Sequence, residues 1–206
     1  MHVLMINGSP HEHGCTYTAL MEMAGELTQA GVTWEILWLG AAPISGCIAC
    51  GACYTGDDRC ALGGIVNAAL EKAEKADGFV FGSPVHYASA SGAICSFLDR
   101  FMYAGPGFAG KPGCAVVSCR RGGASAAFDR LNKYMTICGM PVVSSQYWNS
   151  VHGNTPDEVR QDKEGLQVMR VLGRNMAWLL KCIDAGKLAG IEFPPPEPRI
   201  ATNFIR

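Results

Sequence analysis

Short apolar runs alternate along the chain with longer segments of helical periodicity. Five runs read as buried strands, because they are apolar on both faces: residues 2–7, 33–39, 78–84, 112–119 and 141–148. Segments in which apolar residues recur every three or four positions predict helices: residues 17–31, 65–76, 91–103, 124–139 and roughly 156–185. This alternation predicts an α/β protein with a doubly wound parallel sheet and helices on both of its faces.

The length of 206 residues fits one domain. We expect this domain to span residues 1–189. The remaining segment, residues 190–206, is rich in proline and is expected to be an extended tail that lies along this subunit or a neighbour.

Composition narrows the range of partners. A net charge of −1 with 17% charged residues gives no basic face for nucleic acid. The N-terminus lacks the features of a signal peptide, and no apolar run approaches the roughly 20 residues of a membrane span. We therefore expect a cytoplasmic protein without a membrane span, in which a reducing environment favours free thiols and metal ligands over disulfides.

The loop after the first predicted strand, GSPHEHGCT, has the composition of an anion site. It combines glycine and hydroxyl groups with the start of a helix, where free N–H groups and the helix dipole favour a phosphate. It matches neither a Walker loop nor G-x-G-x-x-G. Ser9, Thr16 and the backbone from His11 to Cys15 are therefore expected to bind a phosphate monoester; the alternative is an ordinary turn with Thr16 as the helix cap.

Two further loops should meet the first at the carboxyl ends of the strands, where open parallel sheets bind ligands. In SPVHYASASG (83–92), His86 and Tyr87 offer an aromatic surface for a flat ring, or are simply exposed loop residues. In SCRRGGAS (118–125), two glycines precede a helix beside Arg120 and Arg121. This arrangement suits the N1 and C2 carbonyl side of an isoalloxazine, and the alternative is a solvated arginine pair.

Four cysteines lie within one glycine-rich stretch, GCIACGACYTGDDRC (46–60). The run C-x2-C-x2-C with a fourth cysteine nearby favours four thiolates around one iron–sulfur cluster: Cys47, Cys50, Cys53 and Cys60. Zinc usually binds two C-x2-4-C pairs with a longer spacer, and a redox dithiol usually begins a helix. Free thiols, zinc and a dithiol remain the alternatives.

Together, GSPHEHGCT, GCIACGAC, FGSPVHYASASGAICSFLDR and the segment SCRRGGASAAFDRLNKYMTICGMPVVSSQYWN resemble the NADPH-dependent FMN reductase family, and specifically its iron–sulfur flavoprotein-like branch. The resemblance covers roughly residues 1–150. It implies a flavodoxin-like three-layer sandwich with strand order 2-1-3-4-5, non-covalent FMN, a compact cysteine motif for a [4Fe–4S] cluster, and homodimers or homotetramers.

The resemblance also implies which residues bind the cofactor. They are Ser9, Gly14, Cys15 and Thr16 for the phosphate loop, Pro84, Val85, His86 and Tyr87 for the first ring-contacting loop, and Ser118, Arg120, Gly122 and Gly123 for the second. From its place in the phosphate loop, His11 is also expected to bind the cofactor. The chain has Cys15 where family members often have asparagine or serine.

The function expected from these features is an oxidoreductase that passes electrons from NAD(P)H through FMN to a quinone, a flavin or a similar small acceptor. The flavin carries the chemistry, so no catalytic side chain is assigned; His86 and Tyr87 shape the acceptor pocket. One alternative is an electron carrier that serves a protein partner such as ferredoxin. Another is a redox sensor or metal-binding regulator that keeps the fold without the catalysis.

Overall fold

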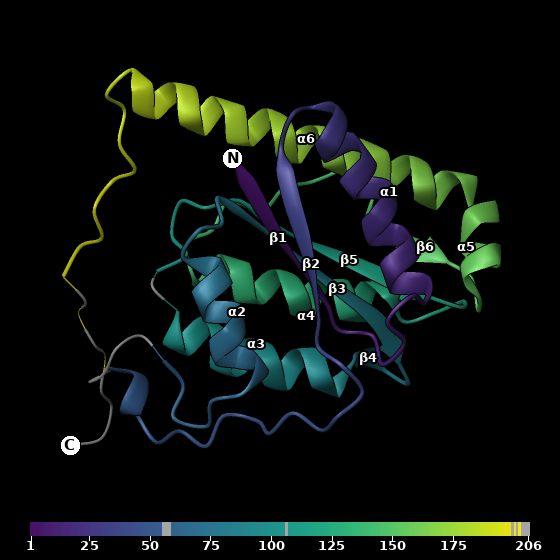
Figure 1. Ribbon diagram of the computed structural model, residues 1–206, viewed down its shortest axis with the longest axis horizontal. Helices are drawn as coiled ribbons and strands as arrows, with labels where there is room; N and C mark the ends of the chain where they lie inside the picture. The colour runs from purple at the N-terminus through teal and green to yellow at the C-terminus, as the bar shows by residue number, and fades with distance from the viewer. Residues whose placement is uncertain (55–58, 106, 199, 201, 203–206) are drawn as a thin grey trace.

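The computed structural model describes residues 1–54, 59–105, 107–198, 200 and 202, and has a twisted sheet between two layers of helices (Figure 1). The strands are β1 (His2–Asn7), β2 (Thr33–Trp38), β3 (Gly78–His86), β4 (Ser89–Ala90), β5 (Gly113–Cys119) and β6 (Ser150–His152). The sheet order is β2-β1-β3-β5-β6, all parallel, and β4 pairs antiparallel with the end of β3. The predicted order 2-1-3-4-5 is therefore confirmed, with the short β4 as a sixth strand that was not predicted.

Helices cover both faces of the sheet, as the alternating pattern predicts. They are α1 (Cys15–Gln29), α2 (Ile65–Ala73), α3 (Gly92–Ala104), α4 (Ala124–Ile137), α5 (Pro156–Gln161) and α6 (Lys163–Leu188), together with a short 3-10 helix, η1 (Ala52–Tyr54). In Figure 1, α1 and α6 lie on one side of the sheet and α2, α3 and α4 on the other.

The central strands are buried on both faces because alternate residues enter two separate cores. On β1, Leu4 and Ile6 belong to the core under α2, α3 and α4, whereas Val3 and Met5 belong to the core under α1 and α6. All four side chains are fully buried. This two-sided burial explains why the strand runs are continuously apolar instead of alternating.

The last predicted strand, residues 141–148, is wrong in its position. Only Val142 forms an isolated bridge, to Gly113, and β6 begins at Ser150. Between them the chain leaves the sheet and is held by α6, since the Ser145 hydroxyl donates to the Val168 carbonyl at 2.7 Å. Where backbone pairing with β5 is interrupted, between Val142 and Ser150, the side-chain Nδ2 of Asn149 donates to the Ala115 carbonyl of β5 at 3.1 Å.

The long helix predicted for residues 156–185 is divided at Asp162. This residue has φ −75° and ψ 79°, outside the helical region, and its carboxylate accepts hydrogen bonds from the N–H groups of Gly165 and His152 at 2.9 and 2.7 Å. The side chain therefore caps α6 while it fixes the end of β6. The break joins the helix terminus to the sheet edge.

Beyond α6, residues 191–198 form neither helix nor strand and are exposed. Their boundary with the domain stays a prediction. Within the described part of the chain, every helix is too short or too polar to cross a bilayer.

Candidate flavin site and cysteine loop

The three predicted site loops meet at the carboxyl ends of β1, β3 and β5. The hydroxyl groups of Thr16 and Ser118 lie 2.8 Å apart and join the first loop to the third. In the sheet, Pro84 is the register partner of Ser118, and the Gly8 N–H donates to the Gly82 carbonyl at 2.9 Å. Residues far apart in sequence thus form one continuous surface.

The first loop is organised by Asn7, a fully buried residue at the end of β1. Its Oδ1 accepts from the Ser9 N–H at 3.1 Å, and its Nδ2 donates to the Glu12 carbonyl at 2.9 Å. The Ser9 hydroxyl accepts from the His11 N–H at 3.1 Å, while the His11 side chain is exposed. Ser9 therefore closes the turn, and its hydroxyl is partly used within the loop.

The amino end of α1 faces this loop. Gly14 is the N-cap residue and supplies no side-chain hydrogen bond, so among the described residues no side chain caps the helix. The first N–H groups, those of Cys15, Thr16 and Tyr17, lack partners within the helix, since the helical ladder begins with Thr18 N–H donating to the Gly14 carbonyl. Thr16 lies inside the helix, so its reading as a helix cap is wrong.

The sulfur of Cys15 contacts the backbone after β6, outside the phosphate loop. Its Sγ lies 3.7 Å from the Gly153 carbonyl, after β6. Burial, together with the negative charge of Glu158, raises the pKa of the Cys15 thiol and outweighs a backbone hydrogen bond that lowers it. The thiol is therefore neutral near pH 7 and contributes no negative charge beside the expected phosphate.

The second and third loops touch one another. Gly123 precedes α4 with φ +87°, and a Cβ there would lie 2.8 Å from the Cγ1 atom of Val85. Tyr87 also has a positive φ, 60°, and its side chain is fully exposed, as is uncommon for a tyrosine. His86 is exposed beside it. Backbone strain and an exposed aromatic pair at this position are consistent with a ligand-binding loop.

The other predicted ring residues divide into two groups. Pro84 is half-buried and Ser118 is buried, so both belong to the floor of the surface. Arg120, Arg121 and Gly122 are exposed at the mouth of the third loop. No ion pair of either arginine is found among the described residues.

Sequence reasoning missed three polar residues that support the loops. Besides Asn7, Trp38 at the end of β2 donates its Nε1–H to the Ser9 carbonyl at 2.8 Å. Ser91, the N-cap of α3, donates its hydroxyl to the Gly8 carbonyl at 2.8 Å. Polar or amphipathic residues at the ends of apolar strands were the available signal, because such positions lie at the edge where the loops meet.

The four predicted cysteine ligands line one cavity of about 170 Å³ between the loop and α3. Cys47 and Cys50 are exposed, whereas Cys53 and Cys60 are partly buried. Within the described residues, no three histidine, cysteine or acidic side chains are close enough together to hold a metal ion. Residues 55–58 of the loop lie outside the described part.

Both expected cofactors can be tested against the donors present. The uncapped N-terminus of α1 fits a flavin phosphate, and the exposed residues of the second and third loops, which touch at Val85 and Gly123, offer a surface for its ring. Four sulfurs around one cavity fit an iron–sulfur cluster in the type and number of ligands. The cluster itself stays a prediction.

Comparison with known proteins places this architecture among flavoproteins. The family model for NADPH-dependent FMN reductase matches residues 1–155. An iron–sulfur flavoprotein of Methanocaldococcus jannaschii is 29% identical over 192 residues, which cover 89% of this chain and 99% of that protein.

Two solved structures show the same fold at low sequence identity. A flavodoxin from the domain Archaea is 16% identical with a TM-score of 0.60, covering 88% of this chain and 99% of its own. The NAD(P)H:quinone oxidoreductase from Methanothermobacter marburgensis is 19% identical with a TM-score of 0.64, covering 85% of this chain and 96% of its own. Since the family model spans most of the sequence and the fold agrees with it, the chain belongs to the NADPH-dependent FMN reductase family.

Proposed function

We propose that this protein is an oxidoreductase that passes electrons from NAD(P)H through bound FMN to a quinone, a flavin or a similar small acceptor. The observation that carries the proposal is the contact between Thr16 and Ser118, which joins an uncapped helix N-terminus to the floor of an open surface. Membership of the family supports the choice of cofactor.

The phosphate of FMN belongs at the first loop. The N–H groups of Cys15, Thr16 and Tyr17 and the positive end of the α1 dipole would hold it. No arginine or lysine lies in residues 8–16, so the backbone supplies the attraction. Asn7 and Trp38 keep the loop in the required shape through their bonds to Ser9 and Glu12.

The flavin ring belongs against the second and third loops, which touch at Val85 and Gly123. Pro84, Val85 and Tyr87 would contact it from one side, and Gly122 and Gly123 from the other, where the absence of side chains permits close approach of the backbone. Arg120 and Arg121 favour negative charge at the N1 and C2 carbonyl end of the ring. FMN supplies the redox chemistry, accepting a hydride from a nicotinamide and releasing electrons to the acceptor.

The test is anaerobic mixing of FMN-loaded protein with NADPH and, separately, NADH. We expect one of them to bleach the flavin absorbance, and a benzoquinone to restore it over repeated cycles. Free FMN at the same concentration is the control, because it reacts slowly without the protein. A protein that binds FMN but is bleached by neither nucleotide would rule out this function.

A second candidate function is an electron carrier that combines FMN with a [4Fe–4S] cluster and serves a protein partner such as ferredoxin. The observation that favours it is the cavity shared by Cys47, Cys50, Cys53 and Cys60. The name of the relative from Methanocaldococcus jannaschii, an iron–sulfur flavoprotein, supports it. Reduction of the flavin by reduced ferredoxin without NAD(P)H would favour this carrier.

The proposal includes assembly into a homodimer or homotetramer in the cytoplasm. Tyr147 and Trp148 are more than half exposed, with ring centroids 5.4 Å apart, in the loop before β6. A neighbouring subunit that covers these rings would also help to enclose the flavin. In this arrangement residues 1–189 form the catalytic domain and residues 190–206 are an extended appendage. Light scattering during gel filtration, with and without residues 190–206, tests both points.

A further inference from the structure

Arg100 is a buried arginine on α3 that lines the cavity of the cysteine loop. Its side chain is 5% exposed, which is unusual for a residue that always carries a positive charge. The Nη2 group donates to the Gly63 carbonyl at 2.7 Å, Nη1 donates to the Ser45 carbonyl at 3.3 Å, and Nε donates to the Cys60 sulfur at 3.1 Å.

These three bonds join the two sides of the loop. Ser45 comes before the first cysteine of the set, and Gly63 comes after the last. One planar guanidinium therefore holds both ends at a fixed separation, which a lysine with a single nitrogen cannot do.

Cys60 is fixed twice. Besides the bond from Arg100 to its sulfur, its N–H donates to the Asn67 Oδ1 atom at 2.9 Å, and its carbonyl accepts from the Asn67 Nδ2 atom at 3.1 Å. Cys47 and Cys50 are exposed instead, and the sulfur of Cys47 accepts only from the nearby Ala49 N–H at 3.4 Å. Cys60 is thus held by two side chains, whereas Cys47 and Cys50 are exposed.

The positive charge of Arg100 indicates what kind of group the cavity of the cysteine loop would bind. Its hydrogen bonds to described residues go to two carbonyl groups and one sulfur, and none of these is a carboxylate. A buried positive charge is costly unless an opposite charge lies near it. An iron–sulfur cluster with four thiolate ligands is anionic, so it would supply such a charge beside Arg100, which a neutral occupant would not.

We propose that Arg100 is the positioning residue of the cysteine loop: it holds Cys60 as the fixed ligand to which an anionic iron–sulfur cluster attaches. This inference rests on the second candidate function. The hydrogen bond from Arg100 to the Cys60 sulfur is also expected to make the reduction potential of the cluster less negative, since hydrogen bonds to ligand sulfurs and local positive charge are among the determinants of cluster potentials.

The experiment compares Arg100→Gln and Arg100→Lys with the matched control Arg130→Gln. Arg130 on α4 also donates its Nε–H to a cysteine sulfur, that of Cys95, at 3.1 Å, but lies outside the cysteine loop. Hydrogen exchange is measured on metal-free protein. Iron content, electron paramagnetic resonance and reduction potential are measured after anaerobic reconstitution with iron and sulfide. Bound FMN and thermal unfolding report whether each variant folds.

In Arg100→Gln, exchange in peptides covering residues 59–66 should rise about tenfold, as expected when buried hydrogen bonds are lost. Iron should fall well below the wild-type amount, and the potential of the remaining cluster should become more negative. Arg100→Lys should show the faster exchange with a smaller change in potential, because it keeps the charge. Arg130→Gln should resemble the wild type in hydrogen exchange, iron content and reduction potential.

Wild-type exchange and iron content in Arg100→Gln would overturn the proposal. If this variant fails to fold, the same comparison with Arg100→Lys decides. A wild-type protein that binds FMN and is bleached by NADPH, but takes up no iron, would overturn the cluster role of Arg100 while leaving the reductase function intact. The two failures are therefore distinguishable.

Discussion

The hydroxyl groups of Thr16 and Ser118 lie 2.8 Å apart, although 102 residues separate them in the chain. Thr16 belongs to the first turn of α1 and Ser118 to the end of β5, and both are buried. This bond fixes the start of the helix against the sheet at the place where the proposed phosphate and ring sites meet.

Thr16→Val should therefore weaken both stability and flavin binding. The change leaves the buried Ser118 hydroxyl without its partner, which costs about 1–3 kcal/mol in the free energy of unfolding. The double variant Thr16→Val with Ser118→Ala should be less unstable than the sum of the single variants, because neither hydroxyl is then left unpaired. Urea unfolding checks this, and additive effects would contradict it.

Gly123→Ala should destabilise the protein by about 1–2 kcal/mol, because alanine disfavours the left-handed backbone that Gly123 adopts and its Cβ would clash with Val85. FMN should also bind more weakly, since the two ring loops would separate. Gly122→Ala is the control for stability, because a Cβ there meets nothing within 4 Å. FMN titration followed by fluorescence measures binding, and urea unfolding measures stability. Equal stability of the two variants in urea would contradict the close contact of Gly123 with Val85.

Trp38→Phe should lower FMN affinity by about fivefold to tenfold, since it removes one hydrogen bond that holds the phosphate loop. The matched control is Trp34→Phe. The Nε1–H of Trp34, near the other end of β2, also donates at 2.8 Å, but to the Thr28 hydroxyl of α1. If both variants bind FMN like the wild type in fluorescence titrations, the loop does not depend on Trp38.

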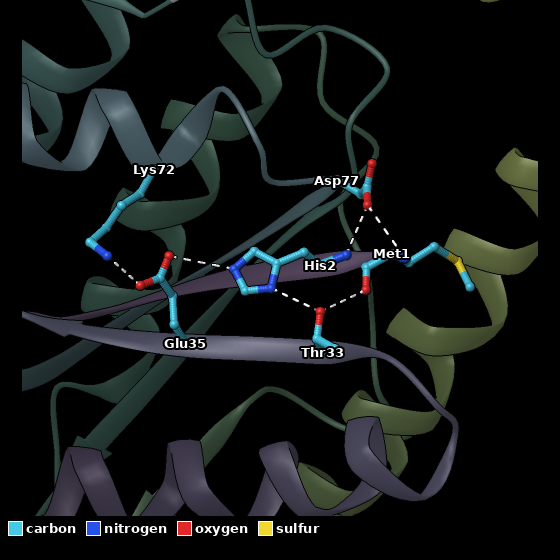
Figure 2. Close-up of polar contacts among 6 residues, drawn as sticks. All are labelled: Met1, His2, Thr33, Glu35, Lys72 and Asp77. Carbon is cyan, nitrogen blue, oxygen red and sulfur yellow. Dashed lines mark hydrogen bonds and ion pairs between the residues drawn. The ribbon is translucent and has the colours of Figure 1, made fainter.

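A pH effect on stability is expected at Glu35, at the opposite end of the sheet. Figure 2 shows this carboxylate between Lys72, 2.5 Å away, and the ring of His2, 3.4 Å away. Burial opposes ionisation, but the hydrogen bonds and charges of Lys72 and His2 outweigh it and lower the pKa of Glu35. The stabilisation is therefore present above the unfolded pKa of about 4.3 and is lost as the pH falls below it.

Glu35→Gln tests this directly. The difference in unfolding free energy between wild type and variant should be largest near neutral pH and should shrink as the pH falls below the ordinary glutamate pKa of about 4.3. Urea unfolding at a series of pH values measures it. Glu71→Gln, which removes an exposed ion pair with Arg59, should change stability by less than about 0.5 kcal/mol. A constant difference across the pH range would contradict the prediction.

Much of the fold is encoded locally. The runs that became β1, β3 and β5 are apolar on both faces, so they could be assigned without tertiary information. The exception is the segment 141–148, which begins with apolar residues and ends with two aromatic ones but leaves the sheet. Its course is decided by contacts such as that between Ser145 and Val168, whose positions depend on how α6 docks. Periodicity alone does not contain that information.

The candidate site divides in the same way. The loops could be located because parallel strands place their carboxyl ends together, and their glycines and hydroxyls lie directly in sequence after the strands. The hydrogen bonds that support these loops could not be located in this way. Trp38 and Arg100 act on loops 29 and up to 55 residues away. The place of Trp38 at the end of a strand indicates the edge that it faces, but nothing in the sequence shows which loop either side chain reaches. Long polar side chains on strands and helices are common, so only the structure identifies which of them reach a loop.

The interrupted pairing beside β5 has a consequence for encounters with other chains. An open strand edge exposes N–H and C=O groups on which a foreign strand can add. Here Val142 pairs near one end of β5, β6 pairs near the other, and the Asn149 side chain occupies the Ala115 carbonyl between them. The loop that carries Tyr147 and Trp148 can therefore leave the sheet while the edge remains blocked against aggregation.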